Sequence, residues 1–237
     1  MTSETGTGTR RALILRGGWE GHQPFEATDF FVPFLEQNGF TVRIEESPAA
    51  YADAEVMAAT DLIVQSMTMS SIEREQLDGL IGAVRAGTGL VGWHGGIADA
   101  FRSSSDYLQF IGGQFAAHPG VPDGERVLDG DGNFVDHAIE FTELGRKHPI
   151  TEGIDDFRLT TEQYWVLSDD YNDVLATTTQ AVRPGDPWSR PVTSPAVWTR
   201  TWGEGRIVVA TPGHRVDVLE IAPVRQIIER GILWATR

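Results

Sequence analysis

The sequence predicts an α/β fold with a mainly parallel central sheet and an antiparallel hairpin near the C-terminal end. In the first half, short apolar runs alternate with amphipathic stretches, which is the pattern of β-α units. One apolar run stops abruptly at a histidine between glycines, in the sequence GWHGG at residues 92–96. Near the end of the chain, the sequence WGEG at residues 202–205 separates two β-like runs and is typical of a hairpin turn.

The elements of the first half follow from the spacing of apolar residues. The expected strands cover residues 12–15, 40–44, 61–64 and 88–93. A helix is expected over residues 25–38, because its phenylalanines and Leu35 recur at helical spacing and Asn38-Gly39 is a typical C-terminal stop. A second helix is expected over residues 70–86, opened by Ser71 and acidic in its early turns. The resulting order alternates strand and helix, as a parallel sheet requires.

The second half is less regular and more β-like. Strands are expected at residues 126–128, 134–135, 174–178, 196–201 and 206–210, the first two flanking the turn sequence DGDGN. The offsets around this turn partly match a calcium loop, but Phe134 stands where that loop needs glycine, so a hairpin turn is predicted. Residues 217–236 are expected to close the chain as an amphipathic helix. The Pro-rich residues 184–195 are interpreted as a surface loop, either a lid or a partner contact.

Length and charge limit the class of protein. With 237 residues the chain is long enough for one well-buried domain, expected over residues 11–237, after a disordered leader at residues 1–10. It has 34 acidic and 19 basic residues and a formal net charge of -15. This balance argues against nucleic acid and anionic membranes as partners, because both need clustered Lys and Arg. A neutral sugar or a bound cation is compatible with it, and so is a homo-oligomer.

Several kinds of site are excluded by missing residues and motifs. The chain has no cysteine, which excludes disulfides, thiolate metal sites and a cysteine nucleophile. The Gly-x-Gly-x-x-Gly spacing of dinucleotide sites is missing, so no nucleotide cofactor is predicted. The first residues lack the apolar core of a signal peptide, and no apolar run reaches the length of a membrane span. A cytoplasmic location is therefore expected.

Histidines follow three of the predicted strands. His94 stands at the apex of the GWHGG turn, His22 ends the sequence GGWEGH after the first strand, and His214 precedes Arg215 after the late strand. Open α/β folds build their sites at the carboxyl ends of parallel strands, so we expect these three histidines around one cleft. His118, between a Gly-Gly pair and Pro119, is interpreted as facing the same site. The alternative is that the glycines only shape turns and the histidines are solvated.

Two further segments carry polar side chains. The sequence TEQYW at residues 161–165 offers a carboxylate, an amide, a phenol and an indole, a mixture that suits sugar hydroxyls and pyranose faces. Its alternative is an amphipathic β-edge with Glu162 in water. His148, in the sequence KHPI, is predicted to be mainly structural because Pro149 fixes a loop entry there.

Taken together, these motifs resemble the ThuA-like, or trehalose utilisation, family. The resemblance rests on GWxxH at 18–22, GWHGG at 92–96, GGxFxxHP at 112–119, HPI at 148–150, ExY at 162–164, PAVW at 195–198, GEGR at 203–206 and GH at 213–214. It implies a class I glutamine amidotransferase-like fold, a flavodoxin-like three-layer sandwich, with His94 where amidotransferases carry their cysteine. Glutaminase chemistry is therefore not expected. The family often has an acidic pair before the tyrosine, whereas here Thr161 precedes Glu162.

The resemblance implies a protein of carbohydrate catabolism, acting on a disaccharide or 3-keto-glycoside related to trehalose as a hydrolase, lyase or isomerase. In one version, His22, His94 and Glu162 hold a divalent metal such as zinc. In the other, His94 or Glu162 transfers a proton beside the carbonyl of a keto-sugar. The residues expected to bind the substrate are Trp19, Trp93, His118, Gln163, Tyr164, His214 and Arg215. The alternative is a non-catalytic sugar-binding or regulatory protein on the same fold.

Overall fold

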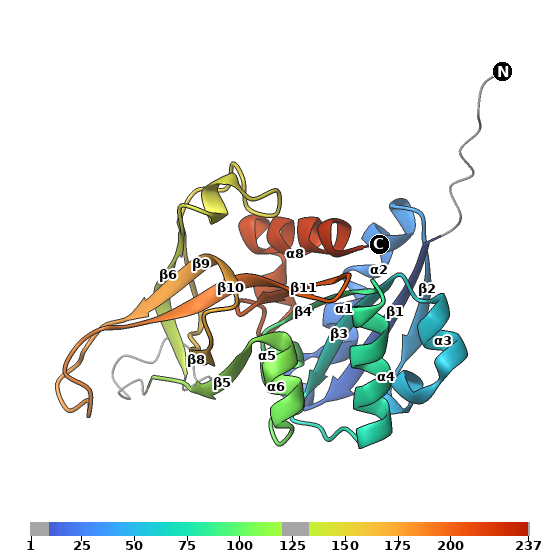
Figure 1. The fold of residues 1–237 in the computed structure, drawn as a ribbon. Coiled ribbons are helices and arrows are strands. Elements are labelled where there is room, and N and C mark those ends of the chain that lie inside the picture. Colours follow the sequence, from blue (N-terminus) through green and yellow to red (C-terminus); the bar gives the residue numbers. More distant parts are fainter. Residues whose placement is uncertain (1–9, 120–132, 237) are drawn as a thin grey trace.

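The central element of the fold is a nine-stranded sheet (Figure 1). The computed structural model describes residues 10–119 and 133–236. Within these residues the strands of the sheet are β1 (Arg10–Gly18), β2 (Phe40–Glu45), β3 (Leu62–Thr68), β4 (Gly89–Trp93), β6 (Phe134–Phe141), β7 (Phe157–Glu162), β9 (Asp173–Gln180), β10 (Val192–Trp202) and β11 (Gly205–Ala210). Strands β5 (Gly113–Ala117) and β8 (Trp165–Ser168) pair separately. Of the leader expected at residues 1–10, residues 1–9 lie outside the described residues and Arg10 belongs to β1. The strand expected at 126–128 and the turn that follows it, up to residue 132, also lie outside them.

The strand order confirms the predicted mainly parallel α/β fold. The sheet runs β2-β1-β3-β4-β11-β10-β9-β6-β7. The first five of these strands pair in parallel, in the order typical of flavodoxin-like folds. Strand β10 then pairs antiparallel with β11, which confirms the predicted hairpin. Strands β9, β6 and β7 extend the sheet with further antiparallel pairs.

Helices cover both faces of the parallel part, which gives three layers. One face carries α1 (Pro24–Asp29), α2 (Val32–Gln37), α7 (Val216–Leu219) and α8 (Ala222–Ala235). The other face carries α3 (Ala54–Ala59), α4 (Arg74–Arg85), α5 (Gly95–Ala98) and α6 (Ser105–Ile111), with the 3-10 turn η2 (Pro48–Ala52). Figure 1 shows α8 and α4 on opposite sides of the sheet. Buried residues of β1 alternate between the two cores, Ile14 in one and Leu15 in the other, because successive side chains of a strand face opposite ways.

Three expected helices have different bounds, for identifiable local reasons. Residues 25–38 form two short helices, since Pro33 has no N–H to continue a helix from α1. Residues 217–236 divide in the same way into α7 and α8, and Pro223 lies in the first turn of α8. The helix expected from residue 70 begins at Arg74, because Glu73 and Gln76 form a reciprocal capping box.

Two 3-10 turns and a Pro-rich loop connect strands of the sheet. The 3-10 turns η1 (Glu20–His22) and η4 (Gly145–Lys147) follow β1 and β6 in the chain. Of the loop expected at residues 184–195, the last four residues belong to β10. Trp188 from this loop packs edge-on against Trp165 of β8, with the ring centroids 5.2 Å apart. No helix in the described part of the chain has the length and apolar character needed to cross a membrane.

Candidate metal centre

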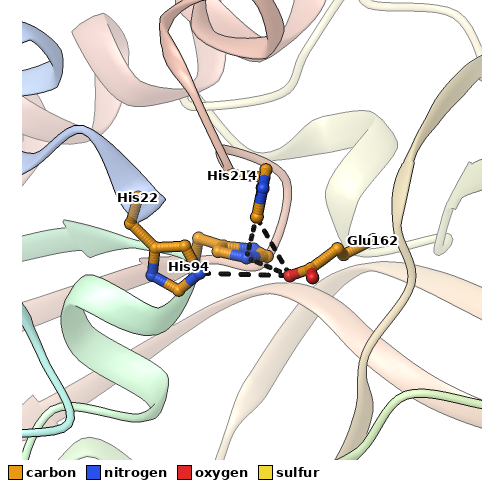
Figure 2. A group of neighbouring side chains, drawn as sticks. All are labelled: His22, His94, Glu162 and His214. Atoms are coloured by element: carbon orange, nitrogen blue, oxygen red, sulfur yellow. Dashed lines mark hydrogen bonds and ion pairs between the residues drawn. The ribbon is translucent and has the colours of Figure 1, made fainter. Parts of the chain in front are cut away.

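Three histidines and one glutamate converge at the carboxyl edge of the parallel strands (Figure 2). His22 follows β1, His94 directly follows β4, and His214 follows β11, whereas Glu162 is the last residue of β7. Their ligand atoms all lie within 4.8 Å of one another, and all four residues are buried. The prediction that the three histidines share one edge of the sheet is confirmed. The structure places His214 in one cluster with the predicted ligands His22, His94 and Glu162.

The donor atoms of this cluster are close enough to share one ion or proton. The His94 Nε2 atom lies 2.9 Å from Glu162 Oε2, and His214 Nδ1 lies 3.0 Å from the same oxygen. His214 Nδ1 and His94 Nε2 are 3.3 Å apart, and His22 Nε2 is 4.0 Å from Glu162 Oε2. A single carboxylate oxygen is therefore the common neighbour of all three imidazoles.

An unusual backbone conformation directs His94 into this cluster. Its φ of 49° and ψ of -140° lie in a region that side-chain-bearing residues rarely adopt. The turn is held by a hydrogen bond from the His94 N–H to Ala210 O at 2.7 Å, and by one from Ala98 N–H to His94 O at 2.9 Å. These bonds tie the end of β4 both to β11 and to the first turn of α5. The predicted sharp turn with His94 at its apex is therefore present.

In His94 and His22, the ring nitrogen that faces away from the cluster, Nδ1, has a hydrogen-bond partner of its own. His94 Nδ1 donates to the carbonyl oxygen of Thr211 at 2.8 Å, because a carbonyl can only accept. His22 Nδ1 lies 2.9 Å from Thr68 Oγ1. Metal-binding histidines are commonly held in this way through the nitrogen that does not bind the metal, which sets the tautomer and the ring orientation. Neutral His94 therefore presents an unprotonated Nε2 to the cluster.

The surroundings of His22 and His94 favour their neutral forms, beside an ionised Glu162 carboxylate. Burial, together with repulsion from His94 and His214, lowers the pKa of His22 to about 2. Burial also lowers the pKa of His94. Burial alone would raise the pKa of Glu162, but the adjacent His214 and His94 rings outweigh it and hold that pKa below its usual range. These are the protonation states in which histidine and glutamate bind metals.

In these protonation states, His94 and Glu162 face each other with electron-pair donors and no proton between them. His94 Nε2 has no proton when the ring is neutral, since its proton is on Nδ1, and it faces the Glu162 carboxylate at 2.9 Å. Two acceptors at this distance repel each other unless a cation or a proton lies between them. His214 Nδ1 lies 3.0 Å from Glu162 Oε2 and 3.3 Å from His94 Nε2, but it carries at most one hydrogen and cannot fully satisfy both acceptors. The geometry therefore suits a bound cation.

Three of the predicted substrate-binding residues surround the cluster. Tyr164 is buried and lies against His94, with ring centroids 4.2 Å apart. His118 Nε2 is 3.5 Å from Glu162 Oε1, and 20% of its side chain is exposed. Trp19 is 47% exposed and meets His22 edge-on at 4.7 Å. These three side chains therefore lie beside the cluster.

The structure does not bring the other predicted residues to the cluster. The prediction for Trp93 is wrong: its ring is 1% exposed and packs in the core against Phe31. Gln163 has a structural contact instead, because its amide nitrogen donates to Thr178 Oγ1 at 2.7 Å. The Arg215 guanidinium lies over the ring of Phe134 at 5.0 Å, and that ring contacts His214. The ring of Phe134 therefore separates the Arg215 guanidinium from His214.

His148 lies away from the cluster, whereas two threonines, Thr68 and Thr211, hold its histidines. His148 packs against Trp234 of α8 with ring centroids 5.0 Å apart, in line with the structural role predicted for it. Thr68 and Thr211, which bond to the Nδ1 atoms of His22 and His94, were not predicted. Thr68 ends β3 at the same edge of the sheet, so its position could have drawn attention to it. Thr211 contributes only a backbone oxygen, which any residue could supply.

Gly95 provides the space for the ring of His22, and this gives a test of the cluster. A Cβ at residue 95 would lie 2.4 Å from His22 Cε1. We expect Gly95→Ala to displace His22 and to lower zinc affinity about 10- to 100-fold, as disturbed ligand orientation does elsewhere. Calorimetric zinc titration measures this change.

The matched control for this substitution is Gly82→Ala in α4, where an added Cβ meets nothing within 4 Å. Alanine is favoured over glycine in helices, so we expect the control to keep its zinc affinity and to unfold at the same or a higher temperature. Equal zinc affinity of the Gly95→Ala variant and the wild type would contradict the placement of His22.

Comparisons with known proteins agree with this fold. Proteins described as ThuA-like from Bacteroides uniformis and Parabacteroides merdae are each 18% identical to the chain, with a TM-score of 0.69. They cover 98% and 96% of this chain, and the matches span 93% and 90% of their own chains. A cytoplasmic protein from Salmonella typhimurium is 14% identical, with a TM-score of 0.64, over 96% of this chain and 100% of its own. Such identities show a shared fold alone.

A search of curated proteins found no match to the sequence. The model of the ThuA family, described as trehalose utilisation, matches residues 11–235. This match covers nearly the whole chain and includes every residue of the cluster. The chain therefore belongs to the ThuA family of trehalose utilisation, and with it to the proteins of carbohydrate utilisation.

Proposed function

We propose that His22, His94, His214 and Glu162 bind a divalent metal ion such as zinc, and that the protein processes a disaccharide or 3-keto-glycoside related to trehalose. The observation that carries this proposal is the convergence of four buried ligand atoms within 4.8 Å. Membership of a trehalose-utilisation family supports a sugar as the substrate.

The donor set fits a metal of this kind. Imidazole nitrogens and a carboxylate oxygen are typical ligands of zinc and of related transition metals. Zinc bonds of about 2.0 Å in a tetrahedral arrangement place the ligand atoms roughly 3.3 Å apart. The four atoms here are separated by 2.9, 3.0, 3.3 and 4.0 Å in the pairs described above. A cation would also remove the repulsion between His94 and Glu162.

The proposed chemistry centres on a sugar carbonyl. When bound, such a metal polarises a carbonyl or activates water. A ketone at the 3-position makes the neighbouring C–H bonds acidic, so removal of a proton there starts an elimination or isomerisation. His118 lies outside the group of four ligands and has a partly exposed side chain, so it would contact the substrate. In a metal-free version of the mechanism, His94 or Glu162 would move the proton directly.

Trp19 would provide the surface on which the sugar ring packs. Its indole is 47% exposed and lies beside His22. We expect Trp19→Ala to raise KM about three- to tenfold, which corresponds to the loss of about 0.5–1.5 kcal/mol of aromatic contact. Zinc affinity should stay unchanged, because Trp19 is not a ligand. Steady-state kinetics with the keto-sugar, together with zinc titration, separate these effects.

Tyr171→Ala is the control for Trp19→Ala. Tyr171 is 58% exposed and contacts Arg200 rather than a residue of the cluster. We expect its removal to leave KM unchanged. An equal rise of KM in both variants would remove Trp19 from the proposed sugar site.

The proposed function is tested by product analysis. The protein, loaded with zinc or treated with a chelator, is incubated with trehalose, sucrose and their 3-keto derivatives, and products are identified by mass spectrometry. We expect the zinc-loaded protein to convert a keto-glycoside and the chelated protein to be inactive. Equal activity after chelation would favour direct proton transfer. Sugar binding without conversion of any substrate would overturn the enzymatic proposal in favour of a sugar-binding or regulatory role.

A further inference from the structure

A buried chain of polar side chains lies behind the His94 turn. Gln65 of β3 is fully buried, and the Tyr51 hydroxyl donates to its Oε1 atom at 2.9 Å. Gln65 Nε2 donates to the Tyr107 hydroxyl at 2.6 Å and to Gly96 O at 3.2 Å. The Tyr107 hydroxyl donates in turn to Ile97 O at 2.9 Å. These contacts join β3, η2 and α6 to the backbone of α5.

The chain of hydrogen bonds satisfies carbonyl groups that α5 cannot satisfy itself. α5 is a single turn, Gly95–Ala98, and a helix leaves its last four carbonyls without a partner inside the helix. The carbonyls of Gly96 and Ile97 are taken up by Gln65 and Tyr107. Burial raises the pKa of Tyr51 and of Tyr107, so both hydroxyls keep the protons that they donate. Each hydrogen bond in the chain therefore has a defined direction.

α5 directly continues the strained turn at His94. The carbonyl of His94 accepts hydrogen bonds from the N–H groups of Ala98 at 2.9 Å and of Ile97 at 3.4 Å. A backbone conformation like that of His94 persists only where the surrounding structure enforces it. The link from Gln65 and Tyr107 to α5 is a constraint of this kind, because it fixes the peptide groups that follow His94.

We propose that Gln65, together with Tyr51 and Tyr107, positions the His94 turn so that His94 Nε2 meets Glu162 and His214. This inference rests on the proposed metal centre and adds a residue that acts through the backbone without touching the ion. Losing a residue that holds a metal ligand in position typically lowers metal affinity about 10- to 100-fold. The chain of side chains would then determine the affinity of the site as well as the packing of the core.

The test compares two buried glutamines. Gln65→Leu removes the hydrogen bonds to Gly96 O of α5 and to the two tyrosine hydroxyls. Gln180→Leu removes an amide that is 2% exposed and has no hydrogen-bond partner among the described residues. We expect Gln65→Leu to fold cooperatively but to bind zinc about 10- to 100-fold more weakly. We expect Gln180→Leu to bind zinc like the wild type. Tyr107→Phe breaks the same chain with a smaller change, and we expect it to weaken zinc binding in the same direction.

A second readout does not depend on a metal. The His94 Nδ1–H group is buried against Thr211 O at 2.8 Å and should give a slowly exchanging imidazole signal in the NMR spectrum of the metal-free protein. We expect this exchange to be faster in Gln65→Leu and unchanged in Gln180→Leu. If the wild type binds no metal but Gln65→Leu changes this signal, the metal proposal fails and the positioning role stands.

Two results overturn the positioning role itself. One is a folded Gln65→Leu variant with wild-type zinc affinity and an unchanged His94 signal. The other is a failure of both Gln65→Leu and Tyr107→Phe to fold, which would make the chain a requirement of the core alone. If only Gln65→Leu fails to fold, Tyr107→Phe decides by the same two measurements.

Discussion

Replacing His94 by alanine is expected to abolish turnover of the sugar and to lower zinc affinity by more than about 100-fold, which exceeds the usual effect of losing a residue that holds a metal ligand in position. The reason is geometric, since His94 Nε2 lies 2.9 Å from Glu162 Oε2 and 3.3 Å from His214 Nδ1. The fold should remain, because backbone hydrogen bonds hold the turn without the imidazole. Zinc titration, product analysis and a thermal unfolding curve measure these three effects.

His148→Ala is the matched control for this substitution. His148 is a partly buried imidazole outside the cluster, which packs against Trp234 and accepts a hydrogen bond from the Ile150 N–H at 3.3 Å. We expect the control to keep zinc affinity and turnover. If the His94→Ala variant kept both as well, the assignment of His94 to the centre would be wrong.

Replacing Glu162 by glutamine should preserve the shape of the site and remove its negative charge. Three imidazoles share the carboxylate as their common neighbour, and the adjacent His214 and His94 rings keep the pKa of Glu162 low, so it is ionised at neutral pH. A neutral amide binds a divalent cation far more weakly than a carboxylate does. We expect zinc affinity and kcat each to fall by about 100-fold or more, measured by titration and by mass-spectrometric rates.

The Glu162→Gln variant also separates the two versions of the mechanism. A joint loss of zinc affinity and turnover favours the metal, whereas a loss of turnover with normal zinc affinity favours direct proton transfer by Glu162. Glu143→Gln is the control, because the Glu143 side chain is 89% exposed and forms a surface ion pair with Lys147. Unchanged affinity and turnover in Glu162→Gln would contradict both the metal version and proton transfer by Glu162.

The histidines of the site could be predicted from the sequence because the parallel strands obey a simple rule. His22, His94 and His214 each follow a strand whose carboxyl end lies at the same edge of the sheet. The glycines around His94 further indicated a turn in an unusual conformation. The rule gives the edge but not the distance, which is why His214 was predicted as a substrate contact rather than as a ligand.

The contribution of Glu162 depends on the antiparallel strands. It ends β7, which reaches the cluster only because β10, β9 and β6 extend the sheet beyond β11. Aromatic residues and an amide beside a carboxylate indicated a site in this segment, but Gln163 forms its contact with β9. Residue type in a short motif therefore predicted the region better than the individual side chains.

The errors have physical causes that are visible in single elements. Trp93 immediately precedes the His94 turn, and neighbouring residues of a strand face opposite sides, so its ring entered the core. Apolar spacing extended two helices through Pro33 and Pro223, where the chain starts new helices instead. Gln65 bonds to Tyr51 and Tyr107, which lie 14 and 42 residues away in the sequence. No local sequence pattern could therefore identify this chain of hydrogen bonds.

We propose that four residues at or after the ends of separate strands form one metal centre, and a cobalt titration tests this most directly. Cobalt takes the ligands that zinc takes, and its visible absorption reports the number and type of donors. We predict saturation at one ion per chain with the spectrum of a site made of nitrogen and oxygen ligands. Single substitutions of His22, His94, His214 and Glu162 should each weaken binding. No saturable binding, or binding that all four substitutions leave unchanged, would contradict the account.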